Sequence, residues 1–174
     1  RFYERYLKEK KTPLGAFQKK VGMCRTCFYK GLPARIYRTW ASILTQIHAG
    51  CVAEQVFGPD TIRMSADLDH KGADFQIEYG DKPLNIQIKK SSYSRDVRTE
   101  KLGRKDIPGR YLTLEYIVLT DADFSQPRNR YGQVKPIHQR FMADKGLMRL
   151  KNGFTVFTPE KFRMLKERID AGKL

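Results

Sequence analysis

Asp74 and Lys89 are the residues of this 174-residue sequence whose types and spacing best suit chemistry. Between them, apolar and polar side chains alternate in two short runs that are separated by a Gly-Asp-Lys-Pro turn. This pattern predicts a β-hairpin over residues 73–90. If Tyr79 pairs with Leu84 across the turn, Asp74 lies directly opposite Lys89, with Cβ atoms about 5 Å apart. A slip of two positions leaves the two side chains diagonal to each other.

A carboxylate and an ammonium group on neighbouring strands suit the hydrolysis of a phosphodiester. Carboxylate oxygens bind Mg²⁺, which lowers the pKa of a bound water, and a nearby ammonium stabilises developing negative charge. Asp69, five residues before Asp74, offers a second carboxylate. The alternative is a surface ion pair without catalytic role. Glu54 is either an extra acid or a surface charge.

Asp74 followed by Gln87-Ile88-Lys89 resembles the PD-(D/E)xK nuclease motif, with Gln87 in place of the second acid. The chain also resembles TaqI-type restriction endonucleases in residue order and approximate spacing, from about residue 13 to residue 165. The matching positions are residues 32–39, 42–43, 45–48, 68–69, 72–74, 87–90, 93 and 150–157.

The resemblance implies a Mg²⁺-dependent endonuclease that cuts double-stranded DNA at a short palindrome. It implies that Asp74 is the central metal ligand, that Asp69 is a supporting acid and that Lys89 is the catalytic lysine. Gln87 offers the metal only a neutral carbonyl oxygen. A palindrome is most simply cut by a two-fold dimer, so we expect a homodimer. Two alternatives stay open: a structure-specific or repair nuclease of the same fold, and a non-catalytic basic nucleic-acid-binding protein.

The charge distribution indicates a polyanionic partner. The chain has 34 Lys and Arg against 19 Asp and Glu, a formal charge of +15. Residues 51–90 form an acidic island, with 5 basic and 7 acidic side chains. Such an acidic island in a basic protein suggests that the basic residues bind a nucleic acid and that the island binds cations. We expect residues 91–110 to form a basic, DNA-facing loop. The expected DNA contacts are Arg35, Arg38, Lys90, Arg95, Arg98, Lys101, Arg104 and Lys105.

The cysteines and the hydropathy exclude several other classes. Cys24 and Cys27 form half of a zinc-ribbon pattern that His48 and Cys51 could complete, but ordinary buried thiols in a reducing cytoplasm are the favoured interpretation. The odd number of cysteines argues against a disulfide framework. No run approaches the roughly 18 apolar residues of a transmembrane helix, so we expect no membrane partner.

The order of elements predicts an α/β protein with a mixed central β-sheet flanked by helices, as a single nuclease domain over residues 1–174. Ile36, Trp40, Ile43, Ile47 and Cys51, widened by Leu44, predict the buried stripe of one long helix. The chain starts at Arg1 rather than Met and is shorter at its N-terminus than members of that family, which leaves open a missing N-terminal region. The expected elements are short helices within residues 1–30, a helix over 33–55, strands over 62–68 and 111–119, a loop over 121–135, a helix over 135–150, a strand over 154–157 and a last helix capped by Thr158.

Overall fold

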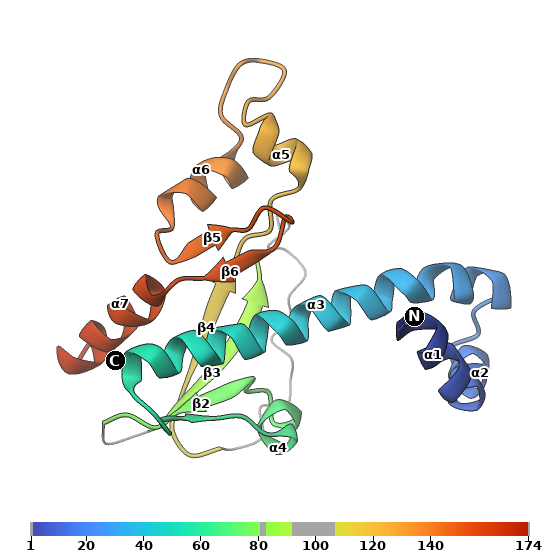
Figure 1. Cartoon of the computed structure of the whole chain (residues 1–174), viewed down its shortest axis with the longest axis horizontal. Coiled ribbons are helices and arrows are strands. Elements are labelled where there is room, and N and C mark those ends of the chain that lie inside the picture. The colour runs from blue at the N-terminus through green and yellow to red at the C-terminus, as the bar shows by residue number, and fades with distance from the viewer. Residues whose placement is uncertain (1, 81–82, 92–106, 174) are drawn as a thin grey trace. The chain divides into compact units, whose positions relative to one another are not determined.

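A computed structural model describes residues 2–80, 83–91 and 107–173 of the chain (Figure 1). The chain divides into two compact units, Arg1–Leu44 and Thr45–Leu174, each with its own hydrophobic core. The long helix α3 (Arg25–Phe57) begins in the first unit and ends in the second. No helix within the described ranges combines the length and the apolar character needed to cross a bilayer.

The first unit contains the short helices expected near the N-terminus, α1 (Phe2–Glu9) and α2 (Lys11–Lys20), together with the beginning of α3. Leu14, Phe28 and Leu32 are its buried core. These side chains bring α2 and the first turns of α3 together, because an isolated helix of this length gains most of its stability from such packing.

Helix α3 is longer than the predicted helix over 33–55, so Pro33 lies inside the helix rather than at its start. The helix begins just after Cys24, whose Sγ accepts a hydrogen bond from the Cys27 amide (3.0 Å). Phe28 and Leu32 are buried in the first unit, so packing holds the segment before Pro33 in the helix. The proline costs one intrahelical hydrogen bond but does not end the helix.

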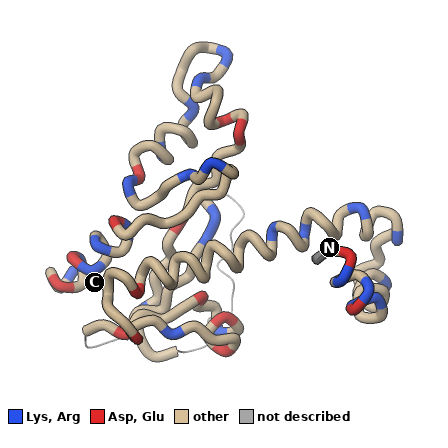
Figure 2. The backbone as a smooth tube through the Cα atoms, viewed as in Figure 1, with Lys and Arg blue, Asp and Glu red and all other residues tan. Residues whose placement is uncertain are grey.

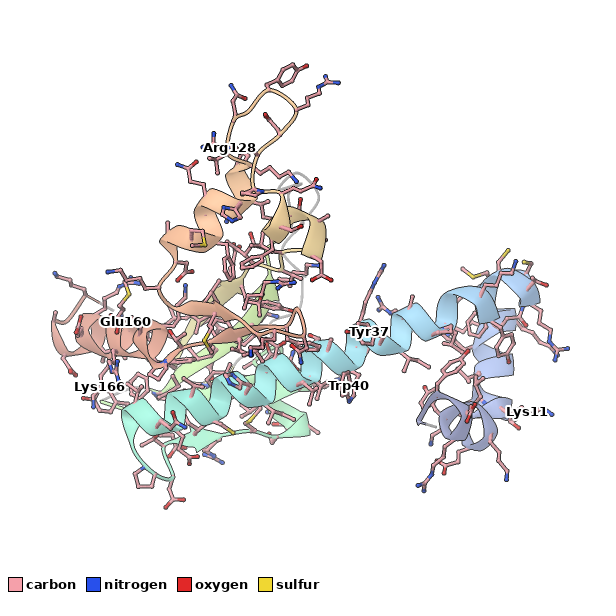
Figure 3. All side chains as sticks on the ribbon, turned by 45° about the horizontal axis from the view of Figure 1, so that its top comes forward. Lys11, Tyr37, Trp40, Arg128, Glu160 and Lys166 are labelled. Atoms are coloured by element: carbon pink, nitrogen blue, oxygen red, sulfur yellow. The ribbon has the colours of Figure 1, made fainter. Side chains whose placement is uncertain are left out.

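The expected buried stripe of α3 is also wrong. Trp40 is 46% exposed and Ile47 is 46% exposed, and Ile43, Leu44 and Cys51 are exposed as well. Figure 3 shows the labelled Tyr37 and Trp40 side chains projecting from the helix. Within the second unit, the buried residues of α3 are Thr45, Ala49, Gly50, Val52, Ala53 and Phe57. Small side chains let the helix approach the sheet closely, and a search for large apolar residues at helical spacing overlooks them.

The second unit is built on a four-stranded mixed sheet in the order β1-β2-β3-β4. Strands β1, β2 and β3 are antiparallel neighbours, and β3 and β4 are parallel. Helices lie against this sheet, which confirms the α/β class with a mixed central sheet flanked by helices (Figure 1). The strands are β1 (Ile62–Arg63), β2 (Phe75–Ile77), β3 (Leu84–Lys90) and β4 (Arg110–Tyr116).

The strand predicted over 62–68 is wrong beyond its first two residues. After β1 the chain forms the short helix α4 (Ala66–His70). The Ser65 hydroxyl accepts a hydrogen bond from the Leu68 amide (3.1 Å), and Asp67 and Asp69 lie in the first turn, where the helix dipole favours negative charge. These capping residues outweigh the accidental alternation of apolar side chains.

Beyond β4, the elements follow the prediction in part. The expected loop over 121–135 contains α5 (Asp121–Ser125), and the expected helix over 135–150 is α6 (Pro136–Ala143) followed by β5 (Leu147–Arg149). The predicted strand near 154–157 is β6 (Thr155–Phe157), which pairs with β5. Helix α7 (Pro159–Asp170) begins where predicted, but the Thr158 hydroxyl donates to the Lys145 carbonyl instead of capping it.

The core of the second unit fixes the central strands. Phe75, Ile77 and Ile86 are fully buried and pack with residues of α3, α6 and α7. Gln76 and Asn85 are buried as well, and the Gln76 Nε2 donates to the Asn85 Oδ1 (2.8 Å). A buried amide that loses its partner is costly, so this pair favours one register of β2 against β3.

Candidate active site

Asp74 directly precedes β2 and is held by the neighbouring strand β3. Its amide donates to the Ile86 carbonyl (2.8 Å), and its Oδ2 accepts from the Ile88 amide (2.5 Å). The carboxylate therefore takes the place of a backbone acceptor at the end of the β2–β3 ladder. This arrangement fixes the carboxylate more firmly than a free surface rotamer would.

The register of the hairpin differs from the prediction by two residues. Leu84 pairs with Ile77 rather than Tyr79, and Gln76 pairs with Asn85. Continued by one residue, this register places Asp74 opposite Gln87 and leaves Lys89 diagonal to it. The directly opposed pairing is therefore wrong, and the alternative slip of two positions, which leaves Asp74 and Lys89 diagonal, is the register that the buried Gln76–Asn85 pair selects.

The pairing of β2 with β3 ends at Ile77 and Leu84. Glu78 lies beyond the end of β2, where its Oε1 forms an ion pair with the Arg63 guanidinium (2.9 Å). The connection between β2 and β3 is thus longer than the four-residue turn that the alternation suggested.

Gln46 of α3 provides a second hydrogen bond to Asp74. Its Nε2 donates to the Asp74 Oδ1 at 2.7 Å, so each carboxylate oxygen accepts one hydrogen bond. Sequence reasoning did not single out Gln46 as a site residue. Its position within the family-like segment of residues 45–48 is the one signal that could have marked it.

Burial dominates the electrostatics of Asp74. The pKa of this carboxyl is raised from 3.8 to about 6, chiefly by burial and also by the negative charge of Asp69. The Ile88 amide and the charge of Lys89 lower the pKa in part. At neutral pH the ionised Asp74 carboxylate destabilises the folded protein, because its charge is partly buried. A bound cation would offset this loss of stability.

Lys89 and Asp69 both lie within electrostatic reach of Asp74 but are placed differently. Lys89 is a half-buried residue of β3, and the described residues show no ion pair between it and Asp74. Asp69 is exposed on α4. Tyr116, at the end of β4, also senses the charge of Asp74, and burial and that charge raise the pKa of its hydroxyl. Sequence reasoning did not single out Tyr116.

The oxygen atoms near Asp74 fit a hard divalent cation. Asp74 and Asp69 offer carboxylates, and the register places the half-buried Gln87 beside Asp74 with an amide oxygen to offer. Oxygen ligands of this kind suit Mg²⁺, which keeps several waters when few protein ligands are present. In the part of the chain that the structure describes, no three His, Cys, Asp or Glu side chains form a metal-binding group.

The other sequence-predicted residues lie apart from this cluster or outside the described ranges. Lys90 is exposed at the end of β3, and Arg35 and Arg38 are exposed on α3 within the first unit. The Glu54 Oε1 accepts from the Asp60 amide (3.2 Å), so Glu54 supports the turn after α3. Most of the predicted loop over 91–110 lies outside the described residues, as do Arg95, Arg98, Lys101, Arg104 and Lys105.

The three cysteines do not match the expectation of buried thiols. Cys24, Cys27 and Cys51 are exposed and free of disulfides. Cys24 and Cys27 interact through the start of α3, and the contact of the two thiols lowers the pKa of Cys24. The hydrogen bond between these two residues therefore stabilises the first turn of α3.

Comparison with known proteins identifies a family over nearly the whole chain. Residues 1–169 match the family model of the TaqI restriction endonuclease. The chain is 29% identical over 161 residues to the type II restriction enzyme TaqI of Thermus aquaticus, and 28% identical over 160 residues to a type II restriction enzyme of Thermus thermophilus. Each match covers 90% of this chain and 60% of the relative, so the chain spans about 60% of the length of these enzymes. No solved structure matches the chain significantly.

Proposed function

We propose, from the premise that the chain belongs to the TaqI restriction endonuclease family, that it is a Mg²⁺-dependent type II endonuclease that hydrolyses double-stranded DNA at a short palindrome. The observation that supports this activity best is the Asp74 carboxylate, which is fixed by Gln46 and Ile88 and is kept at a raised pKa by burial and by Asp69. Such a carboxylate can bind a divalent cation, and the ammonium group of the neighbouring Lys89 can interact with a phosphate.

We assign each side chain a role that its chemistry allows. Asp74, Asp69 and Gln87 would hold Mg²⁺, which when bound neutralises phosphate charge and lowers the pKa of a coordinated water. Gln46 positions the Asp74 carboxylate from α3. Lys89 carries a positive charge beside this cluster, where it orients the attacking water and stabilises the charge that develops on the phosphate.

The charge of the chain supports DNA as the substrate. A formal charge of +15 favours a polyanion through contacts to its phosphates and release of its counterions. We propose that Arg35, Arg38 and Lys90 contribute such contacts, together with the basic segment over residues 91–110. A palindromic target is matched by a two-fold dimer, so we propose a homodimer that acts in the cytoplasm.

Cleavage should depend on a divalent cation. Incubation of a mixed-sequence plasmid with the protein should give discrete fragments in Mg²⁺ or Mn²⁺ and none in EDTA. Without a metal ion, the carboxylates of Asp74 and Asp69 repel the phosphate, and no coordinated water is activated. Ca²⁺ should support DNA binding with little cutting, since its looser coordination positions a water less well. Gel electrophoresis of the digest checks this result, and full cleavage in EDTA would contradict the proposed function.

Gln46→Ala should shift the pH dependence of cleavage. The variant removes a donor to the ionised Asp74, so the pKa of Asp74 should rise by about one unit, as expected for a hydrogen bond to a charged group. The acid limb of kcat/KM against pH, which reports groups of the free enzyme, should move to higher pH by the same amount. Gln55→Ala, at an exposed position of the same helix, is the matched control. An unmoved acid limb would exclude this role of Gln46.

A further inference from the structure

The connection between α5 and α6 is an ordered hairpin, which we call the 127–135 arm (residues 127–135; Figure 1). The Lys135 amide donates to the Pro127 carbonyl (2.8 Å), and the Asn129 amide donates to the Gln133 carbonyl (2.8 Å). These bonds and an isolated antiparallel bridge between Arg128 and Val134 close the two sides of the arm against each other. The sequence predicted only a loop here.

Hydrogen bonds also fix the tip of the arm. The Asn129 Oδ1 accepts from the amides of Tyr131 (2.9 Å) and Gln133 (3.0 Å), and the Asn129 carbonyl accepts from the Gly132 amide (3.0 Å). The Arg128 Nη1 donates to the Gly132 carbonyl (2.6 Å). The tip is thus preorganised, and a ligand that binds it has little ordering entropy to overcome.

The side chains at the tip are exposed, cationic and aromatic. The Arg130 guanidinium lies 4.7 Å from the ring centroid of Tyr131, which is itself 71% exposed. No acidic residue occurs between Asp123 and Asp144, and Figure 2 shows only basic charges along the arm. Arg128, labelled in Figure 3, extends along it. This surface therefore suits an anionic partner with flat, hydrogen-bonding groups.

Helix α6 ties the base of the arm to the edge of the sheet that carries the candidate active site. The Arg140 Nη2 donates to the Ser91 hydroxyl (3.2 Å) and lies 3.9 Å from the Glu115 carboxylate. Ser91 follows β3 directly and is two residues from Lys89. The arm is therefore followed by a helix that contacts the chain directly after the β3 residues Lys89 and Lys90.

Helix α5 ties the other side of the arm to the same edge. Thr120 caps the start of α5 and lies four positions after Tyr116, so the two residues are at most about 14 Å apart. The charge of Asp74 raises the pKa of the Tyr116 hydroxyl. The Lys135 Nζ forms a half-buried ion pair with the Asp123 carboxylate (3.0 Å), which joins α5 to the end of the arm.

We propose that the 127–135 arm enters a groove of duplex DNA beside the scissile phosphate, where Arg130 contacts base edges and so helps to set the target sequence. This inference rests on the proposed function and adds the element that selects the substrate. Stacking on the Tyr131 ring holds the Arg130 guanidinium in one orientation. A guanidinium held in this way can donate two parallel hydrogen bonds to the O6 and N7 atoms of guanine. Asn129 is a positioning residue, because its side chain is occupied by the turn.

Binding of Arg130→Ala and Arg130→Lys to two duplexes tests the proposal. One duplex carries the target mapped from a plasmid digest by the wild-type protein, and the other carries the same bases in scrambled order, both in Ca²⁺, which should allow binding with little cutting. Arg130→Ala should weaken target binding at least ~10-fold and scrambled binding far less, as expected for a lost base contact. Arg130→Lys should not restore the preference, because lysine lacks the planar fork. Arg163→Ala, an exposed arginine of α7, is the control and should change neither.

The outcomes separate the arm from the proposed function. A wild-type protein that cuts no DNA overturns the proposed function. If the wild-type protein cuts at one sequence and Arg130→Ala keeps its preference for it, only the role of the arm is overturned. An equal loss on both duplexes would assign Arg130 to phosphate contact and also overturn base recognition. A change of oligomeric state without DNA, measured by light scattering, would assign the arm to a protein interface instead.

Discussion

The Asp74→Asn variant should cleave DNA at least ~10²-fold more slowly than the wild-type protein, because positioned charges at a reacting phosphate contribute effects of this size. Asparagine keeps the shape of the side chain and one acceptor oxygen for the Ile88 amide or Gln46, so the fold should be retained. Single-turnover cleavage of a plasmid measures the rate. Asp69→Asn should cost less, since Asp69 is exposed on α4 and Asp74 is half-buried. The reverse order of effects would contradict the assignment of Asp74 as the central ligand.

The same variant should be more stable than the wild-type protein in EDTA above pH 6. Burial raises the pKa of Asp74 to about 6, so between pH 3.8 and 6 the folded state holds a proton that the unfolded state releases. The free energy of unfolding of the wild-type protein therefore falls as the pH rises through this window. The asparagine of the variant has no such proton to lose, so the two proteins should converge toward pH 4.

The size of this difference follows from the pKa shift. Each pKa unit corresponds to about 1.4 kcal/mol, but Asp74 keeps part of its surface in solvent, which reduces the gain to about 1–2 kcal/mol at pH 7.5. Urea unfolding of both proteins at pH 4.5 and 7.5 measures it. A variant that is no more stable than the wild-type protein at pH 7.5 would contradict the cost assigned to the ionised Asp74.

Lys89→Met should also lower the cleavage rate at least ~10²-fold, with little effect on folding. Methionine has a similar length and apolar stem but no positive charge, so the variant removes the ammonium group that we propose faces the phosphate. Rapid mixing of saturating protein with a labelled duplex measures the chemical step. Lys151→Ala, at an exposed turn position, is the control for loss of one surface charge. A Lys89→Met protein that cuts at the wild-type rate would exclude a role of Lys89 in that step.

The hairpin could be predicted because its signals are local. Alternation and the turn-forming residues located β2 and β3, with Asp74 directly before β2 and Lys89 near the end of β3. The register could not be predicted, since it depends on Gln76 and Asn85, two polar residues that are buried against each other. Side-chain alternation alone assigns such residues to a solvent-facing surface.

Tertiary contacts account for the other differences. Gln46 lies 28 positions before Asp74, and only the packing of α3 on the sheet brings their side chains together. That packing uses Ala49 and Ala53, while larger apolar residues of the same helix stay exposed. Helix α4 depends on the Ser65 cap, which a two-residue alternation conceals. Local patterns identified most of the elements, but contacts between distant residues determine which side chains of each element are buried.

Sequencing of the DNA ends produced by the protein tests the central claim most directly. A plasmid of known sequence is digested in Mg²⁺ with the wild-type protein and, in parallel, with Asp74→Asn purified in the same way. We predict that all wild-type ends map to one short palindromic sequence, with both strands cut at symmetry-related positions, and that Asp74→Asn yields almost none of them. Ends without a shared sequence, or the same ends at equal yield with Asp74→Asn, would contradict a site-specific endonuclease centred on Asp74.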